Sequence, residues 1–228
     1  MKSLWKKVLA GVLAAGLALS LTACGNGGNA QNSQAGTTGQ QSAAEIDSDG
    51  GNVLIAYFTA AENSGVDAIS SASYTTVDGQ AVGRLRAVAD MIQSNVGGDL
   101  FSIQTAEVYP TDGGELIDYA AQEQEENARP ELTSHIEDLD QYDIVFIGYP
   151  NWWHTAPMII GTFLENYDLT GVDVYPFTQS ASMDTEQFQN SMDFVRESAA
   201  GATVHDGLFV RPSDTAGIDS YLSENSLT

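Results

Sequence analysis

The chain has 228 residues, and its 31 Asp and Glu outnumber its 8 Lys and Arg to give a formal net charge of −23. Three of the basic residues are Lys2, Lys6 and Lys7, so the remainder of the chain has five arginines and no lysine. A surface of this kind repels phosphate backbones. We therefore expect no nucleic-acid binding, and a basic protein partner, or no charged partner, fits the charge better.

The first 24 residues have the pattern of a processing segment. A basic start precedes an apolar run, Val8 to Leu21, that is short for a spanning helix, which needs about 20 apolar residues. Leu21-Thr22-Ala23-Cys24 resembles a bacterial lipobox, which implies cleavage before Cys24 and lipidation of its thiol. The alternatives are an ordinary signal peptide or an uncleaved anchor. We expect a lipoprotein signal peptide over residues 1–24 and an extracytoplasmic protein, lipid-anchored to the cell membrane.

Residues 25–50 are mostly Gly, Asn, Gln, Ser, Ala and Thr. Such a segment buries too little apolar surface to offset the entropy of ordering, so the sequence predicts a flexible tether. A folded domain is then expected over residues 51–228. Because Cys24 is the only cysteine, this domain has no internal disulfide, and no spacing of Cys and His typical of a metal site is present.

The first half of the domain begins with an apolar run, 52–58, that predicts a central strand. A long polar loop is expected over 59–80, followed by a helix over 82–92. A short strand is predicted at 99–104. A second helix is expected to start near Asp112, which is a good N-cap.

The second half is organised around the stretch from Asp143 to Trp153. Its apolar run predicts a strand buried on both faces, and Pro157 then begins an amphipathic helix. Further strands are predicted at 172–177 and 203–210, with helices starting at Asp184 and after Pro212. Five strands that alternate with five helices predict an α/β, doubly wound, five-stranded parallel sheet with helices on both faces.

Trp152 and Trp153 follow the third predicted strand at its carboxyl end, the edge where open α/β sheets bind ligands. The alternative is that both are packing residues. Adjacent residues in extended backbone point to opposite sides, so we expect at most one indole to face a ligand while the other packs inward.

The pattern resembles the flavodoxin family, in particular bacterial members with a Tyr-Pro-x-Trp-Trp motif. The segments that carry the resemblance are 53–59, 97–101, 127–130, 143–153, 162–167 and 176–177. The resemblance implies the strand order 2-1-3-4-5 and flavin mononucleotide (FMN) bound at the switch point between strands 1 and 3. A stacking surface for the flavin is then expected from Pro150, Asn151, Trp152 and Trp153.

The remaining cofactor contacts implied by the resemblance come from two loops. On the phosphate side they are Thr59, Ala60, Gly83, Arg84 and Leu85. Thr59 matches the first hydroxyl of the family's phosphate turn, but the long insertion separates it from Gly83-Arg84-Leu85, where Gly-Asn-Thr is typical. Arg84 either replaces the lost groups with a bidentate phosphate contact or is a solvated helix arginine.

The loop after the fourth strand offers Ser180, Ala181 and Ser182, where relatives often carry a glycine-rich sequence. Their small side chains permit the backbone to approach a flavin. No nucleophile paired with a base stands out, so we predict neither catalytic nor metal-binding residues.

Three functions are compatible with these residues. The first is an FMN-binding, flavodoxin-like lipoprotein that carries electrons outside the cytoplasm and docks on a redox partner with a basic surface. The second is an FMN-dependent oxidoreductase that reduces a small acceptor such as a quinone. The third is a binding module of flavodoxin fold that has lost flavin.

Overall fold

The structure is a computed structural model that describes residues 52–64, 74–77, 80–110, 112–180, 184–210 and 216–228. These residues all belong to one compact unit, Gln41–Thr228. A second unit, Met1–Gln40, lies outside the described residues, and so do the expected signal peptide, Cys24 and the expected tether.

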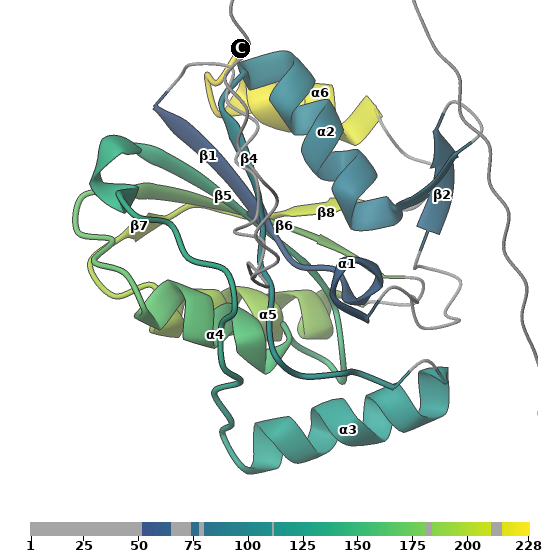
Figure 1. Ribbon diagram of the computed structural model, residues 1–228. Coiled ribbons are helices and arrows are strands. Elements are labelled where there is room, and N and C mark those ends of the chain that lie inside the picture. The colour runs from purple at the N-terminus through teal and green to yellow at the C-terminus, as the bar shows by residue number, and fades with distance from the viewer. Residues whose placement is uncertain (1–51, 65–73, 78–79, 111, 181–183, 211–215) are drawn as a thin grey trace, which may run out of the picture. The chain divides into compact units, whose positions relative to one another are not determined.

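A parallel β-sheet forms the centre of the described unit (Figure 1). Its strands are β1 (Val53–Tyr57), β4 (Asp99–Ser102), β5 (Ile144–Pro150), β6 (Asp173–Gln179), β7 (Thr203–Val204) and β8 (Leu208–Val210). They lie in the order β4-β1-β5-β6-β7, and β8 also pairs with β6. The predicted fold class and the predicted order 2-1-3-4-5 are thereby confirmed.

The last predicted strand, 203–210, is divided into β7 and β8. Both pair with β6, but β7 pairs with Asp173 and Val174, whereas β8 pairs with the segment from Phe177 to Gln179. Pro176 lies opposite the break. Because proline has no N–H to donate, it interrupts the ladder at this point.

Helices cover both faces of the sheet (Figure 1). They are α1 (Ala60–Ser64), α2 (Arg84–Val96), α3 (Gly113–Glu125), α4 (Met158–Glu165), α5 (Thr185–Ser198) and α6 (Ala216–Glu224), with a 3₁₀ turn at Leu139–Gln141. α2 and α6 pack on one face in one apolar cluster. α4 and α5 pack on the other face, where α3 lies beside α4. Every central strand is therefore buried on both sides, as its continuous apolar sequence predicted.

Two predicted helix starts are confirmed by their caps. The Asp112 carboxylate accepts hydrogen bonds from the backbone N–H groups of Gly114 and Glu115, and the Asp184 carboxylate accepts one from Gln187. Each bond satisfies an amide that has no partner inside its helix.

The prediction of a long loop over 59–80 is wrong in part. It contains the short helix α1 and β2 (Tyr74–Val77), which pairs antiparallel with β3 (Gln80–Gly83). The sequence had a signal for this hairpin, because Asp78-Gly79 is a typical two-residue turn and β-branched residues precede it. The polar character of the segment masked that signal. The hairpin leads directly into α2, which begins at Arg84 rather than at residue 82.

Candidate functional site

The carboxyl ends of β1, β5 and β6 lie side by side. Tyr57 pairs with Gly148 across one ladder, and Gly148 pairs with Phe177 across the next. The Phe58 N–H continues the first ladder by donating to the Gly148 carbonyl at 2.9 Å. The three loops that the sequence predicted to hold a cofactor therefore start from adjacent positions on one edge of the sheet. In open α/β sheets, this edge is where ligands bind.

The hairpin brings Gly83 against Thr59, although 24 positions separate them in the sequence. A Cβ added to Gly83 would lie 3.3 Å from the Thr59 hydroxyl oxygen, so the two residues are in contact. Gly83 is the N-cap of α2 and makes no side-chain cap hydrogen bond. The start of α2 therefore presents backbone N–H groups beside a hydroxyl, which is the arrangement that binds anions at helix N-termini.

The charges in the first turn of α2 also favour an anion. α3, α5 and α6 each have an acidic residue in the first turn, as the helix dipole prefers. The first turn of α2 has none and begins instead with Arg84, with Arg86 two residues on. Two of the chain's five arginines thus stand at one helix start in a strongly acidic protein. Cationic side chains at a helix start oppose the helix dipole, and for Arg86 the carboxylates of Asp90 and Glu62 offset part of this cost.

Arg86 was not among the predicted site residues. Its guanidinium donates to the Tyr57 hydroxyl at 2.8 Å and to Asp90 at 2.6 Å, and it lies 3.7 Å from Glu62. The Tyr57 hydroxyl in turn donates to Glu62, and burial together with that carboxylate raises the pKa of Tyr57. This network fixes α1 and α2 against the end of β1. The i,i+4 spacing of Arg86 and Asp90 was the only sign of it in the sequence.

The two indoles lie in different environments, as expected. Trp152 is 9% exposed and packs edge-on against Phe58 and Tyr109, with ring centroids 5.5 and 4.9 Å away. Trp153 is 45% exposed. The physical cause is a turn rather than extended backbone: Trp152 and Thr155 exchange backbone hydrogen bonds, and Trp153 between them has a φ of 43°. A positive φ is uncommon for a residue with a side chain, and such strain is often found at functional sites.

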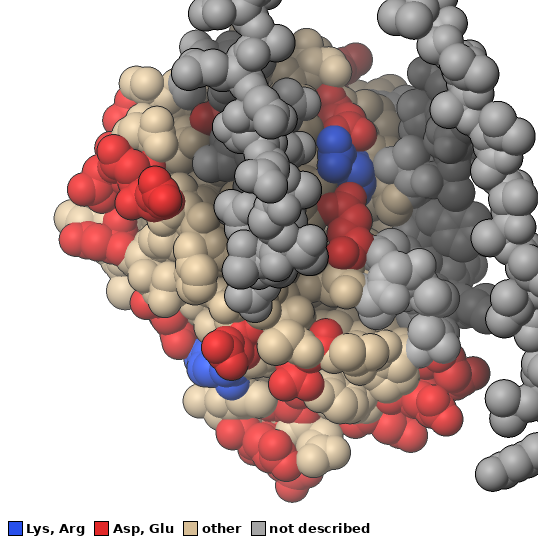
Figure 2. Space-filling model, in the orientation of Figure 1, with Lys and Arg blue, Asp and Glu red and all other residues tan. Residues whose placement is uncertain are grey.

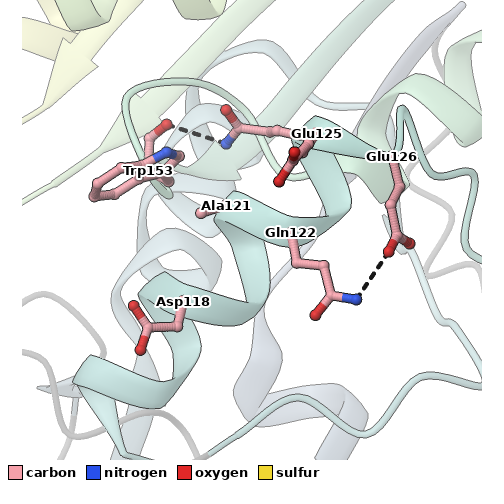
Figure 3. Close-up of a pocket in the computed structure, with 7 residues that line it drawn as sticks. Asp118, Ala121, Gln122, Glu125, Glu126 and Trp153 are labelled. Atoms are coloured by element: carbon pink, nitrogen blue, oxygen red, sulfur yellow. Dashed lines mark hydrogen bonds between the residues drawn. The ribbon is translucent and has the colours of Figure 1, made fainter.

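Trp153 stands at one side of an open groove that runs along α3. Figure 3 shows its ring beside this helix, with Asp118, Glu125 and Glu126 on the same groove. The Gln124 side chain donates to the backbone carbonyls of Trp152 and Trp153 at 3.2 and 3.0 Å. These bonds connect the loop that carries Trp152 and Trp153, the tryptophan loop, to α3. They hold the exposed indole of Trp153 close to the carboxylates of this helix.

Asn151 and Gln179 bring two unsatisfied polar atoms to the same edge of the sheet. The Asn151 N–H donates to the Gln179 carbonyl at 3.2 Å, which links the loops after β5 and β6. Gln179 is 3% exposed. Its Nε2 and the Oδ1 of Asn151 are buried and have no hydrogen-bond partner among the described residues. Because an unpaired buried polar group costs about 1–3 kcal/mol, a donor and an acceptor left here favour a ligand that supplies both partners.

The other predicted cofactor residues differ in what they can offer. The side chains of Ala60 and Leu85 are buried, and Leu85 belongs to the core under α2, so its backbone is what can meet a ligand. Pro150 ends β5, and Ser180 directly follows β6. Ala181 and Ser182 lie outside the described residues.

Metal clusters and membrane-spanning helices are both absent from the part of the chain that the structure describes. Among those residues, no group of three or more His, Cys, Asp or Glu side chains has the arrangement of a metal site. No helix described there has both the length and the apolar character needed to cross a bilayer.

A family model described as flavodoxin matches residues 52–217, which is most of the chain. The chain belongs to the flavodoxin family. The predicted family is therefore confirmed, and the matched range includes every strand and all three loops at the carboxyl edge. No curated protein matches the chain.

Solved structures of flavodoxin type are similar to this flavodoxin-family chain. A candidate flavoprotein from Bacteroides eggerthii is 28% identical, with a TM-score of 0.60, over 77% of this chain and 98% of its own. A second candidate flavoprotein, from Bacteroides uniformis, is 25% identical, with a TM-score of 0.59, over 77% and 99%. A flavoprotein from Lactobacillus acidophilus in complex with FMN is 22% identical, with a TM-score of 0.51, over 76% and 97%. The last of these likenesses concerns the fold alone.

Proposed function

We propose that this flavodoxin-family protein binds FMN at the carboxyl edge of β1, β5 and β6. The observation that carries the proposal is the start of α2, where the N-cap Gly83 contacts the Thr59 hydroxyl and supplies no side-chain cap, and where the first turn has arginines in place of acidic residues. A phosphate group is the dianion that such a site stabilises. The complex of the Lactobacillus flavoprotein with FMN supports this choice of ligand.

The second part of the site fits the isoalloxazine ring. Its pyrimidine end carries carbonyl acceptors and an N–H donor, and the buried Gln179 Nε2 and Asn151 Oδ1 are a donor and an acceptor that lack partners. Trp153, exposed at the adjacent loop, can cover an aromatic face. The start of α2 therefore fits the phosphate of FMN, and Asn151, Gln179 and Trp153 fit its ring. When bound, the flavin supplies reversible electron transfer, and the protein holds and orients it.

We further propose that the protein carries electrons to a partner with a basic surface. Figure 2 shows carboxylate side chains spread over the described part of one face, with few cationic groups among them. Three of the described arginines are already paired with carboxylates: Arg86, Arg129 and Arg196. The groove with Trp153 and the carboxylates of α3 suits Lys or Arg side chains, because both carboxylates and an indole face attract cations.

An absorption spectrum of the purified full-length protein tests the first proposal. We expect the visible absorption bands of an oxidised flavin, and flavin fluorescence that is quenched on titration with an equimolar end point. A colourless protein that fails to saturate at micromolar FMN contradicts the proposal and favours a binding module that has lost flavin.

Salt dependence tests the carrier function. After chemical reduction, we expect the protein to reduce cytochrome c, a basic acceptor, at a rate that falls steeply as NaCl increases, because screening weakens steering. Ferricyanide, an anionic acceptor, is the control and should show the opposite trend. Steady turnover of a quinone with a nicotinamide donor would instead identify a reductase.

We propose, finally, that the protein acts outside the cytoplasm and is lipid-anchored through Cys24. The support is the lipobox-like sequence behind the apolar run. Metabolic labelling with an alkyne-bearing fatty acid should mark the wild-type chain and leave Cys24→Ser unmarked. Equal labelling of both chains would exclude Cys24 as the modified residue.

A further inference from the structure

The insertion after β1 divides the proposed phosphate site into two parts. Thr59 directly precedes α1, whereas Gly83 directly precedes α2, and residues 60–82 separate the two in the sequence. The entropy lost when the two ends of such a segment are brought together increases with its length. Contacts that join the two parts are therefore needed if the site is to exist before a ligand binds.

Glu62 and Asn63, both on α1, hold the first part in place. The Glu62 carboxylate accepts hydrogen bonds from the Tyr57 hydroxyl at 2.9 Å and from the Ser102 hydroxyl. The Asn63 side chain donates to the Thr59 carbonyl at 3.0 Å. Because Tyr57 ends β1 and Ser102 ends β4, these bonds fix α1 and Thr59 against the carboxyl ends of two strands.

Arg86 lies where the two parts of the site meet. A Cβ added to Gly83 would lie 3.3 Å from the Thr59 hydroxyl oxygen and 3.8 Å from the Arg86 Cβ. The Arg86 Nη1 donates to the Tyr57 hydroxyl at 2.8 Å and lies 3.7 Å from a Glu62 carboxylate oxygen. Arg86 therefore connects α2 to the same network that holds α1.

The guanidinium of Arg86 is already bonded within the protein. Its Nε donates to Asp90, one turn further along α2, at 2.6 Å, while its Nη1 donates to Tyr57. Because a guanidinium is planar and its donors have a fixed arrangement, two such bonds set its orientation. The charge of Arg86 is thus directed toward the end of β1, and its two carboxylate neighbours partly neutralise it.

We propose that Arg86 is a positioning residue for the phosphate of FMN, a role that rests on the proposed function. Through Tyr57 and Glu62 it holds the start of α2 beside Thr59 before a ligand arrives, and it does not itself contact the phosphate. A site that is ordered in advance binds more tightly, because less ordering is required on association.

Fluorescence titrations with FMN and with riboflavin test the proposal. Riboflavin has the same ring system but no phosphate, so it reports on the rest of the site. Arg86→Gln should weaken FMN binding at least about tenfold and riboflavin binding by less than about twofold. Arg196→Gln is the matched control and should leave both affinities unchanged, since Arg196 also pairs with a carboxylate of its own helix but lies outside the proposed site. Equal weakening of both flavins by Arg86→Gln would indicate a general structural role and overturn the proposal.

Tyr57→Phe separates positioning from a direct effect of charge. It removes the hydroxyl that Arg86 binds and leaves the charge of Arg86 in place. We expect FMN binding to weaken about fivefold or more, because a hydrogen bond that holds α2 is lost. The double variant should bind FMN no more weakly than Arg86→Gln alone. Full affinity in Tyr57→Phe, or additive losses in the double variant, would mean that Arg86 acts on the phosphate through its charge.

Hydrogen exchange of the flavin-free, full-length protein gives a measurement that needs no ligand. Arg86→Gln should speed the exchange of the α1 amides at least about tenfold and leave those of α5 unchanged, because only α1 loses a contact. Unchanged exchange in α1 overturns the positioning role even if FMN still binds. A wild-type chain that binds neither flavin refutes the proposed function instead, and the role in flavin binding with it. If Arg86→Gln does not fold, Tyr57→Phe replaces it in both experiments.

Discussion

The ring of Phe177 on β6 occupies the space beside the α-carbon of Gly148 on β5. An ideal Cβ at position 148 would overlap three atoms of that ring, so this strand position has no room for a side chain. The two residues are register partners in adjacent parallel strands. The contact closes the core just before β5 ends and the tryptophan loop begins.

Gly148→Ala should therefore destabilise the fold by about 1–3 kcal/mol, because an extra methyl group in a packed core forces side chains to move. Urea unfolding measures the loss. In a Phe177→Leu background the same change should cost less, since the smaller side chain leaves space. An equal cost in both backgrounds would mean that the phenylalanine ring is not the obstacle.

A second prediction concerns the hydroxyl beside Gly83. Thr59→Ala should weaken FMN binding about tenfold or more, because a charge-assisted hydrogen bond to the phosphate is lost. Thr59→Ser keeps the hydroxyl and should bind FMN nearly as tightly as the wild-type chain. Flavin fluorescence titration compares the two, with urea unfolding to show that both are folded. Equal loss in both variants would assign the effect to the methyl group and its packing.

The two indoles should differ sharply on removal. Trp152→Ala should cost about 3–5 kcal/mol of stability, because it leaves a cavity against Phe58 and Tyr109. Trp153→Ala should change stability by less than about 1 kcal/mol, since its ring is half-exposed, and should weaken FMN binding instead. Unfolding and flavin titrations on both variants check this. A large stability loss for Trp153→Ala would contradict the observed exposure.

Glu123 should make stability depend on pH. Its pKa is about 7 in the folded state, above the ordinary glutamate value near 4.3, so the folded state holds its proton more tightly than the unfolded state. The stability from Glu123 is then fully present below about pH 4.3 and is lost as the pH rises to about 7, by up to about 3 kcal/mol in all.

Glu123→Gln removes this dependence and should gain stability relative to the wild-type chain over the same pH window. Chemical unfolding at several pH values gives the difference, and Glu125→Gln on the exposed side of α3 is the matched control. A difference between wild type and Glu123→Gln that stays constant between pH 4.5 and 7 would show that this carboxyl does not titrate as described.

The order of the sheet could be predicted because each strand is an apolar run with a turn signal at its end. Val53–Tyr57 and Ile144–Pro150 are examples. The inward and outward indoles were also predicted, although the reason given was extended backbone and the cause is the turn between Trp152 and Thr155. The hairpin of β2 and β3 was missed, since its few apolar residues gave no periodic pattern, although the sequence Asp78-Gly79 is typical of a turn.

Partners among polar groups could not be predicted in the same way. Arg86 with Tyr57, Asn151 with Gln179, and Glu107 with Glu123 are pairs that join separate elements of the chain. The spacing of these residues in the sequence does not predict that they are in contact. Their contact depends on the register of the strands and on how the helices pack against the sheet.

The amino-acid sequence by itself determined the family, the alternation of strands and helices, and the edge where a cofactor belongs, because hydrophobic period and turn residues act locally along the chain. The tertiary structure decided which side chains share that edge and which carboxylate is buried close to a second one. Burial and electrostatic fields are set by neighbours in space, so Glu123 becomes unlike the other acidic residues only once the chain is folded around it.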